Sequence, residues 1–233
     1  MGTKIGIIAA MDIELQLLRQ DLEGEESQVI TGKTYYTGSL CGQSVVMAVC
    51  GVGKVNAAVC AQTMILKFAP ELLINTGVAG GLAAGIGVGG VVVASDAVQH
   101  DMDTTVIGSP HGALDVCGKY TVNLPCDKNT AQALLEQAKK LGAAAVLGTV
   151  ASGDQFIHCP QRNEFLRGTF NAACCEMEGG AIAHVCAMSG TRCAIVRVMS
   201  DSADNDAPVN FLEFAPKAAD LSAKIVRGFL GAL

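Results

Sequence analysis

Short apolar runs alternate with segments of helical periodicity along almost the whole chain, and this alternation is what most constrains its fold. Short runs rich in β-branched residues are typical of buried strands, whereas apolar residues three and four positions apart are typical of helices that pack on a core. The alternation predicts an α/β fold: a mixed central β-sheet flanked by helices, with sites at the carboxyl ends of strands. No linker or repeat interrupts it, so residues 1–233 are expected to form a single domain.

The individual elements follow from these two periods. Strands are predicted at 4–9, 34–36, 44–49, 72–75, 90–94, 143–150, 172–176 and 193–199. Helices are predicted at 11–22, from the turn 51–54 to Phe68, and at 130–141, 161–167, 179–188 and 211–229. The strands at 34–36 and 44–49 are expected to pair antiparallel around Cys41-Gly42.

The net charge argues against polyanionic partners. The chain has a formal charge of −6, and its lysines and arginines form no cluster. Nucleic-acid backbones and anionic membranes attract basic patches, so neither is an expected partner. The uncharged stretch 72–95 is rich in glycine, whereas a spanning helix needs bulky apolar residues throughout. This stretch is interpreted as a strand, a glycine loop and a second strand.

The cysteines and the mean hydropathy indicate the cellular compartment and whether the chain forms an oligomer. The ten cysteines include no Cys-x-x-Cys pair, and the chain starts without a signal-peptide pattern. Reduced, buried thiols in a cytoplasmic protein are therefore expected. The mean hydropathy of +0.39 is high and indicates an apolar subunit interface.

Four acidic residues follow apolar runs at the ends of predicted elements. They are Glu14, Glu176, Glu178 and Asp201. Carboxylates in partly dry surroundings have shifted pKa values, which suits acid/base chemistry on a neutral small molecule. For Glu176 a structural role is expected, as a helix cap or in a salt bridge, because its side chain should point away from that of Glu178.

Two glycine-rich turns follow predicted strands. The turn Gly51-Val52-Gly53-Lys54 resembles a phosphate-binding loop but lacks its full spacing, and a tight strand-to-helix turn explains it equally well. The segment Asn75 to Gly81 ends a buried strand, where glycines let the backbone approach a ligand. The second turn is therefore the stronger candidate for a binding site.

An aromatic residue follows another predicted strand, in the segment 152–157. The ring of Phe156 could stack on a flat heterocycle, and the backbone of Ile157 could hydrogen-bond to the edge of that heterocycle. A single phenylalanine is also a common core residue, so residue types alone leave both interpretations open.

Other classes of site find no support in the residue pattern. The four histidines have no ligand spacing with cysteines or acids, so no metal is expected, and no other cofactor either. There is no Gly-x-Ser-x-Gly motif and no cysteine with a nearby histidine pattern, so nucleophilic catalysis is not expected.

Six motifs together resemble the purine nucleoside phosphorylase/hydrolase family. They are IGIIAAMDIE, GVGKVNAA, INTGVAGG, GDQFI, EMEGGAIAHVC and VRVMSDSAD. Each is weak alone, but their combination and order are specific and span nearly the whole chain. The resemblance implies a three-layer nucleoside phosphorylase-like fold and a cytoplasmic homodimer whose partner chain covers part of the site. It also implies hydrolysis of the N-glycosidic bond of adenine thionucleosides, such as 5′-methylthioadenosine and S-adenosylhomocysteine, with release of adenine.

The same resemblance assigns roles to residues. Asp201 would donate a proton to N7 of adenine, Glu14 would activate water, and Glu178 would hold the ribose hydroxyls. The remaining expected substrate contacts are apolar side chains or backbone: Val52, Val78, Gly80, Phe156, Ile157, Met177, Ala203 and Phe211. Among these, Phe156 would stack on adenine while the backbone of Ile157 reads its edge.

The chain departs from the family pattern at two places. Val78 stands where the hydrolases usually carry a serine, and the region 104–115 lacks the usual aromatic residue and proline, with Asp115 in place of the proline. These are the positions expected near the ribose and the 5′ substituent. The preferred 5′ substituent is therefore left open.

Three alternatives to this nucleosidase remain. A phosphorylase needs fixed cations for phosphate, but Asn75 stands where related phosphorylases carry an arginine, and Glu14 would repel phosphate. A hydrolase of futalosine-type nucleosides is a second alternative. A non-catalytic purine nucleoside-binding protein is a third, and the presence of both Glu14 and Asp201 argues against it.

Overall fold

The structure is a computed structural model that describes residues 4–204 and 206–233. Residues 1–3, where a signal peptide would begin, and residue 205 lie outside this description. The strands are β1 (Ile5–Ala9), β2 (Glu23–Ile30), β3 (Lys33–Leu40), β4 (Gln43–Val49), β5 (Leu72–Gly81), β6 (Val91–Gln99), β7 (Leu114–Val116), β8 (Lys119–Thr121), β9 (Leu124–Pro125), β10 (Ala145–Ser152), β11 (Ala172–Glu176) and β12 (Arg192–Asp201). The helices are α1 (Asp12–Gln20), α2 (Lys54–Phe68), α3 (Lys128–Lys140), α4 (Pro160–Phe170), α5 (Gly179–Ser189) and α6 (Ala207–Leu230), with a 3₁₀ turn η1 (Thr105–Ile107).

The main sheet is mixed and partly closes on itself. Its strand order is β11-β10-β6-β12-β5-β1-β4-β3-β2, and β9 pairs with β6. Strand β12 is parallel to β5 but antiparallel to β6, which makes the sheet mixed. Strand β11 is parallel to β10 and also meets the end of β5, where Cys175 pairs with Gly80. This second pairing brings the ends of β5, β11 and β12 together.

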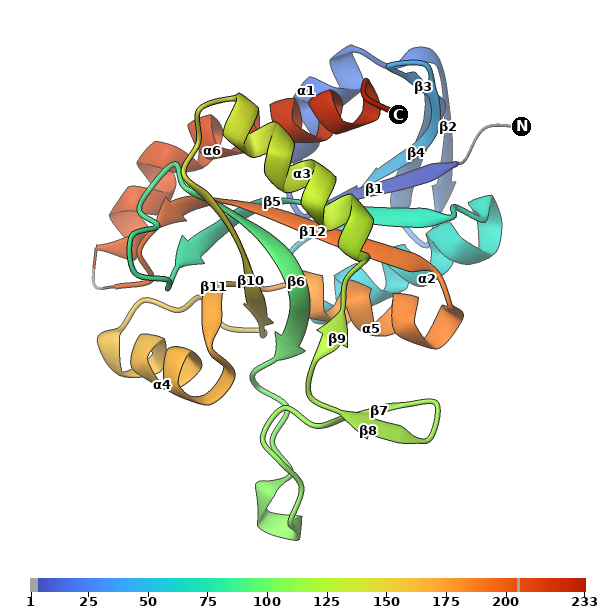
Figure 1. The fold of residues 1–233 in the computed structure, drawn as a ribbon. Coiled ribbons are helices and arrows are strands. Elements are labelled where there is room, and N and C mark those ends of the chain that lie inside the picture. Colours follow the sequence, from blue (N-terminus) through green and yellow to red (C-terminus); the bar gives the residue numbers. More distant parts are fainter. Residues whose placement is uncertain (1–3, 205) are drawn as a thin grey trace.

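Helices cover both faces of the sheet. Helices α1, α3 and α6 lie on one face, and α2 and α5 lie on the other (Figure 1). Alternate residues of a strand point to opposite faces, so Leu73 of β5 packs in the core on the α2 and α5 side, while Leu72 and Ile74 pack on the other side. The prediction of an α/β fold with a mixed sheet flanked by helices is confirmed.

Several element boundaries differ from the prediction, for local reasons. Strand β2 was not predicted because its sequence, EGEESQVI, is polar and exposed at the edge of the sheet. Strand β6 continues past Ala94 through the polar pair Ser95-Asp96, where it pairs with β9. Helix α6 begins at Ala207 rather than at Phe211, with a proline in its first turn, a position that needs no N–H donor.

Strands β5 and β12 are longer than the apolar runs that predicted them. Strand β5 continues through the glycine-rich segment to Gly81, and all ten of its residues are buried. Strand β12 continues to Asp201. The candidate residues at these ends are therefore fixed in a sheet and not in mobile loops, which holds a site more rigidly.

Candidate active site

A pocket opens where the ends of β5, β11 and β12 meet. It is lined by Ala10, Met11, Glu14, Val52, Val78, Ala79, Gly80, Gln155, Phe156, Ile157, Cys175, Glu176, Met177, Glu178, Ser200, Asp201 and Phe211. All the residues predicted from the sequence as site residues line it, except Ala203. Ala203 is fully buried beside the pocket, and its contribution is a backbone N–H to Asp201.

Asp201 lies at the end of β12 with its carboxylate held by short-range contacts. The N–H of Ala203 donates to Oδ1 at 2.9 Å, and the hydroxyl of Ser200 donates to Oδ2 at 2.8 Å. Burial raises the pKa of Asp201, and although these two hydrogen bonds lower it, the pKa stays above its ordinary value. Asp201 is therefore suited to hold a proton and to donate it.

Gly80 allows this carboxylate to lie against the backbone of β5. A Cβ atom at position 80 would lie 2.8 Å from Oδ1 of Asp201 and 3.3 Å from Sγ of Cys175. A side chain at this position would push the carboxylate of Asp201 out of place, so a glycine suits the point where the three strands converge. The backbone is thereby exposed to a ligand at that point.

Glu14 lies in the first turn of α1 and also lines the pocket. Its carboxylate accepts hydrogen bonds from the N–H groups of Ala10 at 2.9 Å, Met11 at 2.8 Å and Val78 at 3.0 Å. Burial raises the pKa of Glu14 more than the charge of Arg197 and these N–H groups lower it. Glu14 is thus a stronger base than an exposed glutamate, and its position is fixed by three donors.

Arg197 is a functional residue that the sequence analysis did not single out. It lies in the middle of β12, is 1% exposed, and donates hydrogen bonds to Glu176 and Asn75. Its nitrogen Nη2 also lies 3.9 Å from Oε2 of Glu178. Burial lowers the pKa of Arg197, but the surrounding carboxylates raise it above its ordinary value, so this arginine stays charged. The feature of the sequence that could have identified Arg197 is an arginine inside an otherwise apolar strand.

Glu176 has the structural role that was expected of it. Its Oε2 accepts hydrogen bonds from the N–H groups of Glu178 at 3.1 Å and Gly179 at 2.8 Å, at the start of α5, in addition to the contact with Arg197. Its Oε1 accepts a hydrogen bond from the hydroxyl of Ser152. Glu176 therefore caps a helix and holds the buried guanidinium at the same time.

Of the three carboxylates around Arg197, that of Glu178 accepts the fewest hydrogen bonds, so its negative charge is the least compensated. Its Oε1 accepts one hydrogen bond, from the N–H of Gly53 at 2.9 Å. Burial raises its pKa to about 7, with a further contribution from repulsion by Glu176, against which Arg197 acts only partly. Glu178 therefore changes its charge near neutral pH, and it faces the pocket.

The rest of the pocket is an apolar wall. The rings of Phe156 and Phe211 meet edge to face, with centroids 5.7 Å apart and an interplanar angle of 85°. Phe156 remains 43% exposed, so part of its surface is free to stack on a ligand. Val78 and Met177 complete this wall next to the carboxylates. The pocket combines a flat apolar surface with acids at fixed positions, which suits a planar heterocycle attached to a polar group.

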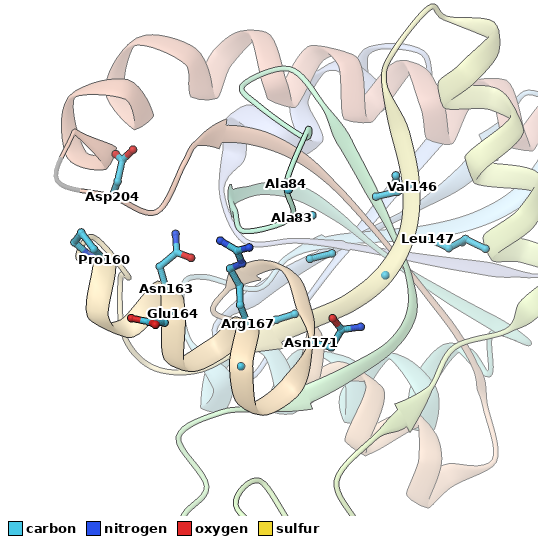
Figure 2. Close-up of a pocket in the computed structure, with 14 residues that line it drawn as sticks. Ala83, Ala84, Val146, Leu147, Pro160, Asn163, Glu164, Arg167, Asn171 and Asp204 are labelled. Atoms are coloured by element: carbon cyan, nitrogen blue, oxygen red, sulfur yellow. The ribbon is translucent and has the colours of Figure 1, made fainter.

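A second hollow lies between α4 and β10 and is of a different kind (Figure 2). Its labelled polar side chains include Glu164, Arg167 and Asn171, all of which are exposed to solvent. It contains no buried carboxylate, whereas Glu14, Glu178 and Asp201 are all buried in the first pocket. Acid/base chemistry is accordingly assigned to the first pocket.

Two other properties can be stated for residues 4–204 and 206–233. In this part of the chain, no group of three or more His, Cys, Asp or Glu side chains is arranged to hold a metal ion. In the same part, none of the helices is sufficiently long and apolar to span a membrane.

Comparison with known proteins places this site in a family. The model of the phosphorylase superfamily matches residues 4–231. A 5′-methylthioadenosine/S-adenosylhomocysteine nucleosidase from Geobacillus thermodenitrificans is 39% identical over 233 residues, which cover 97% of this chain and 96% of the relative.

Solved structures show the same similarity. A 5′-methylthioadenosine/S-adenosylhomocysteine nucleosidase from Neisseria meningitidis, in complex with methylthio-immucillin-A, has a TM-score of 0.94 and 36% identity, covering 99% of this chain and 100% of that chain. Futalosine hydrolase of Helicobacter pylori has a TM-score of 0.92 and 30% identity, covering 99% and 98%. Both alignments extend over essentially the whole fold, including every strand that carries a pocket residue.

Glu178 should make the protein less stable as the pH rises through neutrality. Its folded pKa is about 7 against an ordinary 4.5, so between these values the folded protein binds one more proton than the unfolded chain. The stabilisation from this proton is complete below about 4.5 and is lost as the pH rises through about 7. Glu178→Gln removes this titration and should gain up to about 3 kcal/mol of unfolding free energy relative to the wild type from about pH 5 to about pH 8.

Urea unfolding of both proteins at one fixed protein concentration measures this difference. Glu164→Gln, in the exposed groove of Figure 2, is the matched control and should follow the wild type at every pH. Parallel stability profiles of the wild type and Glu178→Gln would show that Glu178 does not titrate as described.

Proposed function

This chain belongs to the phosphorylase superfamily, and we propose that it hydrolyses the N-glycosidic bond of 5′-methylthioadenosine and S-adenosylhomocysteine, releasing adenine and a 5-thioribose. The observation that carries the proposal is the pair of buried acids, Asp201 and Glu14, that line one pocket with a large apolar surface. Cleavage of such a bond needs an acid at the leaving base and an acceptor at the attacking water, as in other glycoside hydrolyses.

Asp201 is the proposed general acid. A purine anion is a poor leaving group, and a proton on N7 converts it to neutral adenine. The raised pKa of Asp201 favours the protonated carboxyl group that this role needs, and general acid catalysis of this kind contributes about 10²–10⁴ in rate. The N–H of Ala203 and the hydroxyl of Ser200 hold the carboxyl group in one orientation toward the base.

Glu14 is the proposed general base for water. The sugar develops oxocarbenium character in the transition state, and a water molecule attacks it from the side opposite the base. Glu14 accepts a proton from this water, and its raised pKa makes it more effective for this purpose than an exposed glutamate. The three N–H donors from Ala10, Met11 and Val78 fix the carboxylate, which reduces the cost of orienting it.

Glu178 and the apolar wall hold the substrate in this scheme. Ribose hydroxyls donate to Glu178, and both these donors and the developing positive charge on the sugar favour its ionised form. Met177 packs on the sugar and Phe156 on adenine, while the backbone of Ile157 binds the edge of the base. The contacts made by Val52, Gly80 and Phe211 then close the pocket around the base and the sugar.

Charge balance favours water over phosphate as the nucleophile. A phosphate site needs a free cation, and Arg197, the arginine buried at this pocket, is already bound by Glu176 and lies 3.9 Å from Glu178. Glu14 adds a further negative charge where phosphate would have to lie. The pocket therefore favours a hydrolase over a phosphorylase, and the presence of both Glu14 and Asp201 favours an enzyme over a binding protein.

Adenine should be released from 5′-methylthioadenosine and S-adenosylhomocysteine in phosphate-free buffer. Liquid chromatography of the free base measures this release, and the panel should include futalosine, because a futalosine hydrolase is among the similar structures. Strict dependence on added phosphate would identify a phosphorylase instead. Turnover of futalosine with neither adenosine substrate cleaved would assign the other hydrolase activity.

Loss of either acid should remove most of the turnover while the fold is retained. Asp201→Asn removes the proton donor, and Glu14→Gln removes the acceptor, so each should lower kcat by about 10²–10⁴. Glu164→Gln, outside the pocket, should keep the wild-type rate. Steady-state kinetics and circular dichroism test the set, and a near-wild-type kcat for either acid variant would contradict the role given to that residue.

We further propose a homodimer whose partner chain covers part of the pocket. Val55 and Val59 of α2 are 75% and 39% exposed, and Val52, at the pocket, is 50% exposed. Val106 and Ile107 of η1 are 93% and 80% exposed, on the green extension that projects from the body in Figure 1. These apolar side chains support an interface between two copies, with the projecting turn of each reaching toward the other's pocket.

A charge on this face should separate the two copies. Val55→Glu places a carboxylate in the proposed interface and should convert the dimer to a monomer with reduced kcat/KM, as measured by sedimentation velocity and kinetics. Val29→Glu, which is 69% exposed on the edge strand β2, is the matched control and should remain a dimer. A dimeric Val55→Glu protein would rule out this face.

Two further expectations belong to the proposal. Residues 1–233 act as one catalytic domain, since α1 near one end and β12 and α6 near the other all contribute residues to the pocket. The ten free thiols of the described residues support activity in the cytoplasm, where thiols stay reduced.

A further inference from the structure

Three charged residues beside the pocket form a closed ring of hydrogen bonds. The ammonium of Lys54 donates to Oδ1 of Asp101 at 2.6 Å. The other oxygen of Asp101, Oδ2, accepts a hydrogen bond from the N–H of Asp154 at 2.9 Å. The carboxylate of Asp154 in turn accepts a hydrogen bond from the N–H of Lys54 at 2.8 Å, which closes the Lys54–Asp101–Asp154 ring.

The ring joins three segments that are far apart in the sequence. Lys54 begins α2 directly after the turn that carries Val52, Asp101 follows β6, and Asp154 follows β10. Two residues after Asp154 comes Phe156, and then Ile157, both of which line the pocket. The ring therefore anchors the beginning of the loop that carries these two residues, here called the 153–157 loop.

The same turn of α2 is also tied to the sugar side of the pocket. The N–H of Gly53 donates to Glu178, and the next N–H, that of Lys54, donates to Asp154. Two consecutive N–H groups at the start of α2 are thus bound by two carboxylates, that of Glu178 in the pocket and that of Asp154 beside it. Because the helix terminus is rigid, it sets the separation between Glu178 and the 153–157 loop.

Close packing and backbone hydrogen bonds also restrict the position of the 153–157 loop. A Cβ atom at Gly153 would lie 2.4 Å from the ring of His100 and 3.1 Å from Cγ of Asp101. The N–H of His100 donates to the carbonyl of Ser152 at 2.9 Å, and the N–H of Gly153 donates to the carbonyl of Glu176 at 3.1 Å. The loop is therefore pressed against the segment that supplies Asp101, and the ring fixes its position there.

The Lys54–Asp101 contact of the ring is partly sheltered from solvent, whereas Asp154 is exposed. The side chains of Lys54 and Asp101 are each 19% exposed. Burial alone would raise the pKa of Asp101, but the hydrogen bonds from Lys54 and Asp154 bring it below its ordinary value, so Asp101 stays charged. Charge-assisted hydrogen bonds in such partly dry surroundings are stronger and more directional than exposed ion pairs.

We propose that the Lys54–Asp101–Asp154 ring positions the 153–157 loop for recognition of the purine base, so that its three members are positioning residues for base selectivity. None of the three lines the pocket, and they act through Phe156 and Ile157. The inference rests on the proposed function, in which these two residues contact adenine. Opening the ring lets the loop shift against Glu178 and Asp201, which loosens discrimination at position 6 of the base more than it loosens the fold.

Isosteric variants that open the ring test this directly. Lys54→Met and Asp101→Asn should each narrow the preference for 5′-methylthioadenosine over 5′-methylthioinosine, measured as a ratio of kcat/KM values, by about tenfold, which corresponds to about 1.4 kcal/mol. The two substrates differ only at the edge of the base. A general loss of active protein lowers both rates equally and leaves this ratio unchanged, so the ratio separates positioning from mere stability.

The chain provides a matched control pair. Lys224 and Asp220 on α6 also form a contact of 2.6 Å, but it is exposed and outside the pocket. Lys224→Met and Asp220→Asn should leave the ratio at the wild-type value. The double variant Lys54→Met/Asp101→Asn should narrow the ratio no further than either single variant, because opening the ring once removes its effect.

Failure of the ring proposal can be distinguished from failure of the proposed function. A wild-type protein that cleaves neither substrate refutes the proposed function, and the ring is then tested by the calorimetric affinities for adenine and hypoxanthine in the same variants. If Lys54→Met does not fold, Lys54→Gln replaces it. An unchanged ratio in folded, dimeric ring variants, or an equal change in the control pair, overturns the proposal.

Discussion

The buried guanidinium of Arg197 is the interaction on which the site depends. It lies between Glu176 and Glu178 and close enough to Glu14 for their charges to interact. One cation therefore faces three buried carboxylates, and the negative charge is compensated only in part. Burying uncompensated charge is costly, and a protein responds by raising the pKa of the least compensated group. Here that group is Glu178, whose carboxylate receives one N–H donor, while Glu14 receives three.

The fold supplies the space for this arrangement at a few backbone positions. A Cβ atom at Gly77 would lie 2.5 Å from both Nη1 of Arg197 and Oε1 of Glu14, so only a glycine leaves room for both charged groups. Asn75, two residues earlier on the same face of β5, accepts a hydrogen bond from Arg197 and donates one to the carbonyl of Ile8 at 3.0 Å. Strand β5 thus links the guanidinium to the neighbouring strands β1 and β12.

Local patterns predicted the layers of the fold and the acids of the pocket, whereas Val52, Met177 and Phe211 were expected only from the resemblance to a family. Glu14, Glu178 and Asp201 follow apolar runs, and the ends of such runs meet at one edge of a sheet. Arg197 was missed because a charge inside a strand has no meaning until its partners, which lie 21 and 122 residues away in the sequence, are known.

The ring was beyond prediction for a related reason, whereas Ala203 was expected as a substrate contact and has a different role in the structure. The members of the Lys54–Asp101–Asp154 ring are separated by 47 and 53 residues, and no periodicity relates such positions. Ala203 acts through a backbone N–H, for which its side chain gives no indication. The edge strand β2 lacks the apolar alternation on which strand prediction depends, because both of its faces are exposed.

The incomplete compensation of charge also determines which nucleophile the pocket accepts. Glu176 and Glu178 balance much of the positive charge of Arg197, so little of it remains to attract an anion. Glu14 adds a third carboxylate whose charge interacts with Arg197. A phosphate dianion would meet repulsion from Glu14 and could gain the guanidinium only by displacing Glu176, which also accepts hydrogen bonds from Ser152 and from two N–H groups at the start of α5. Water carries no charge and needs only an acceptor, which is the role proposed for Glu14. Burial raises the pKa of Glu178 and the negative charge of Glu176 raises it further, and this same excess of negative charge disfavours phosphate, so the pKa of Glu178 and the preference for water are linked.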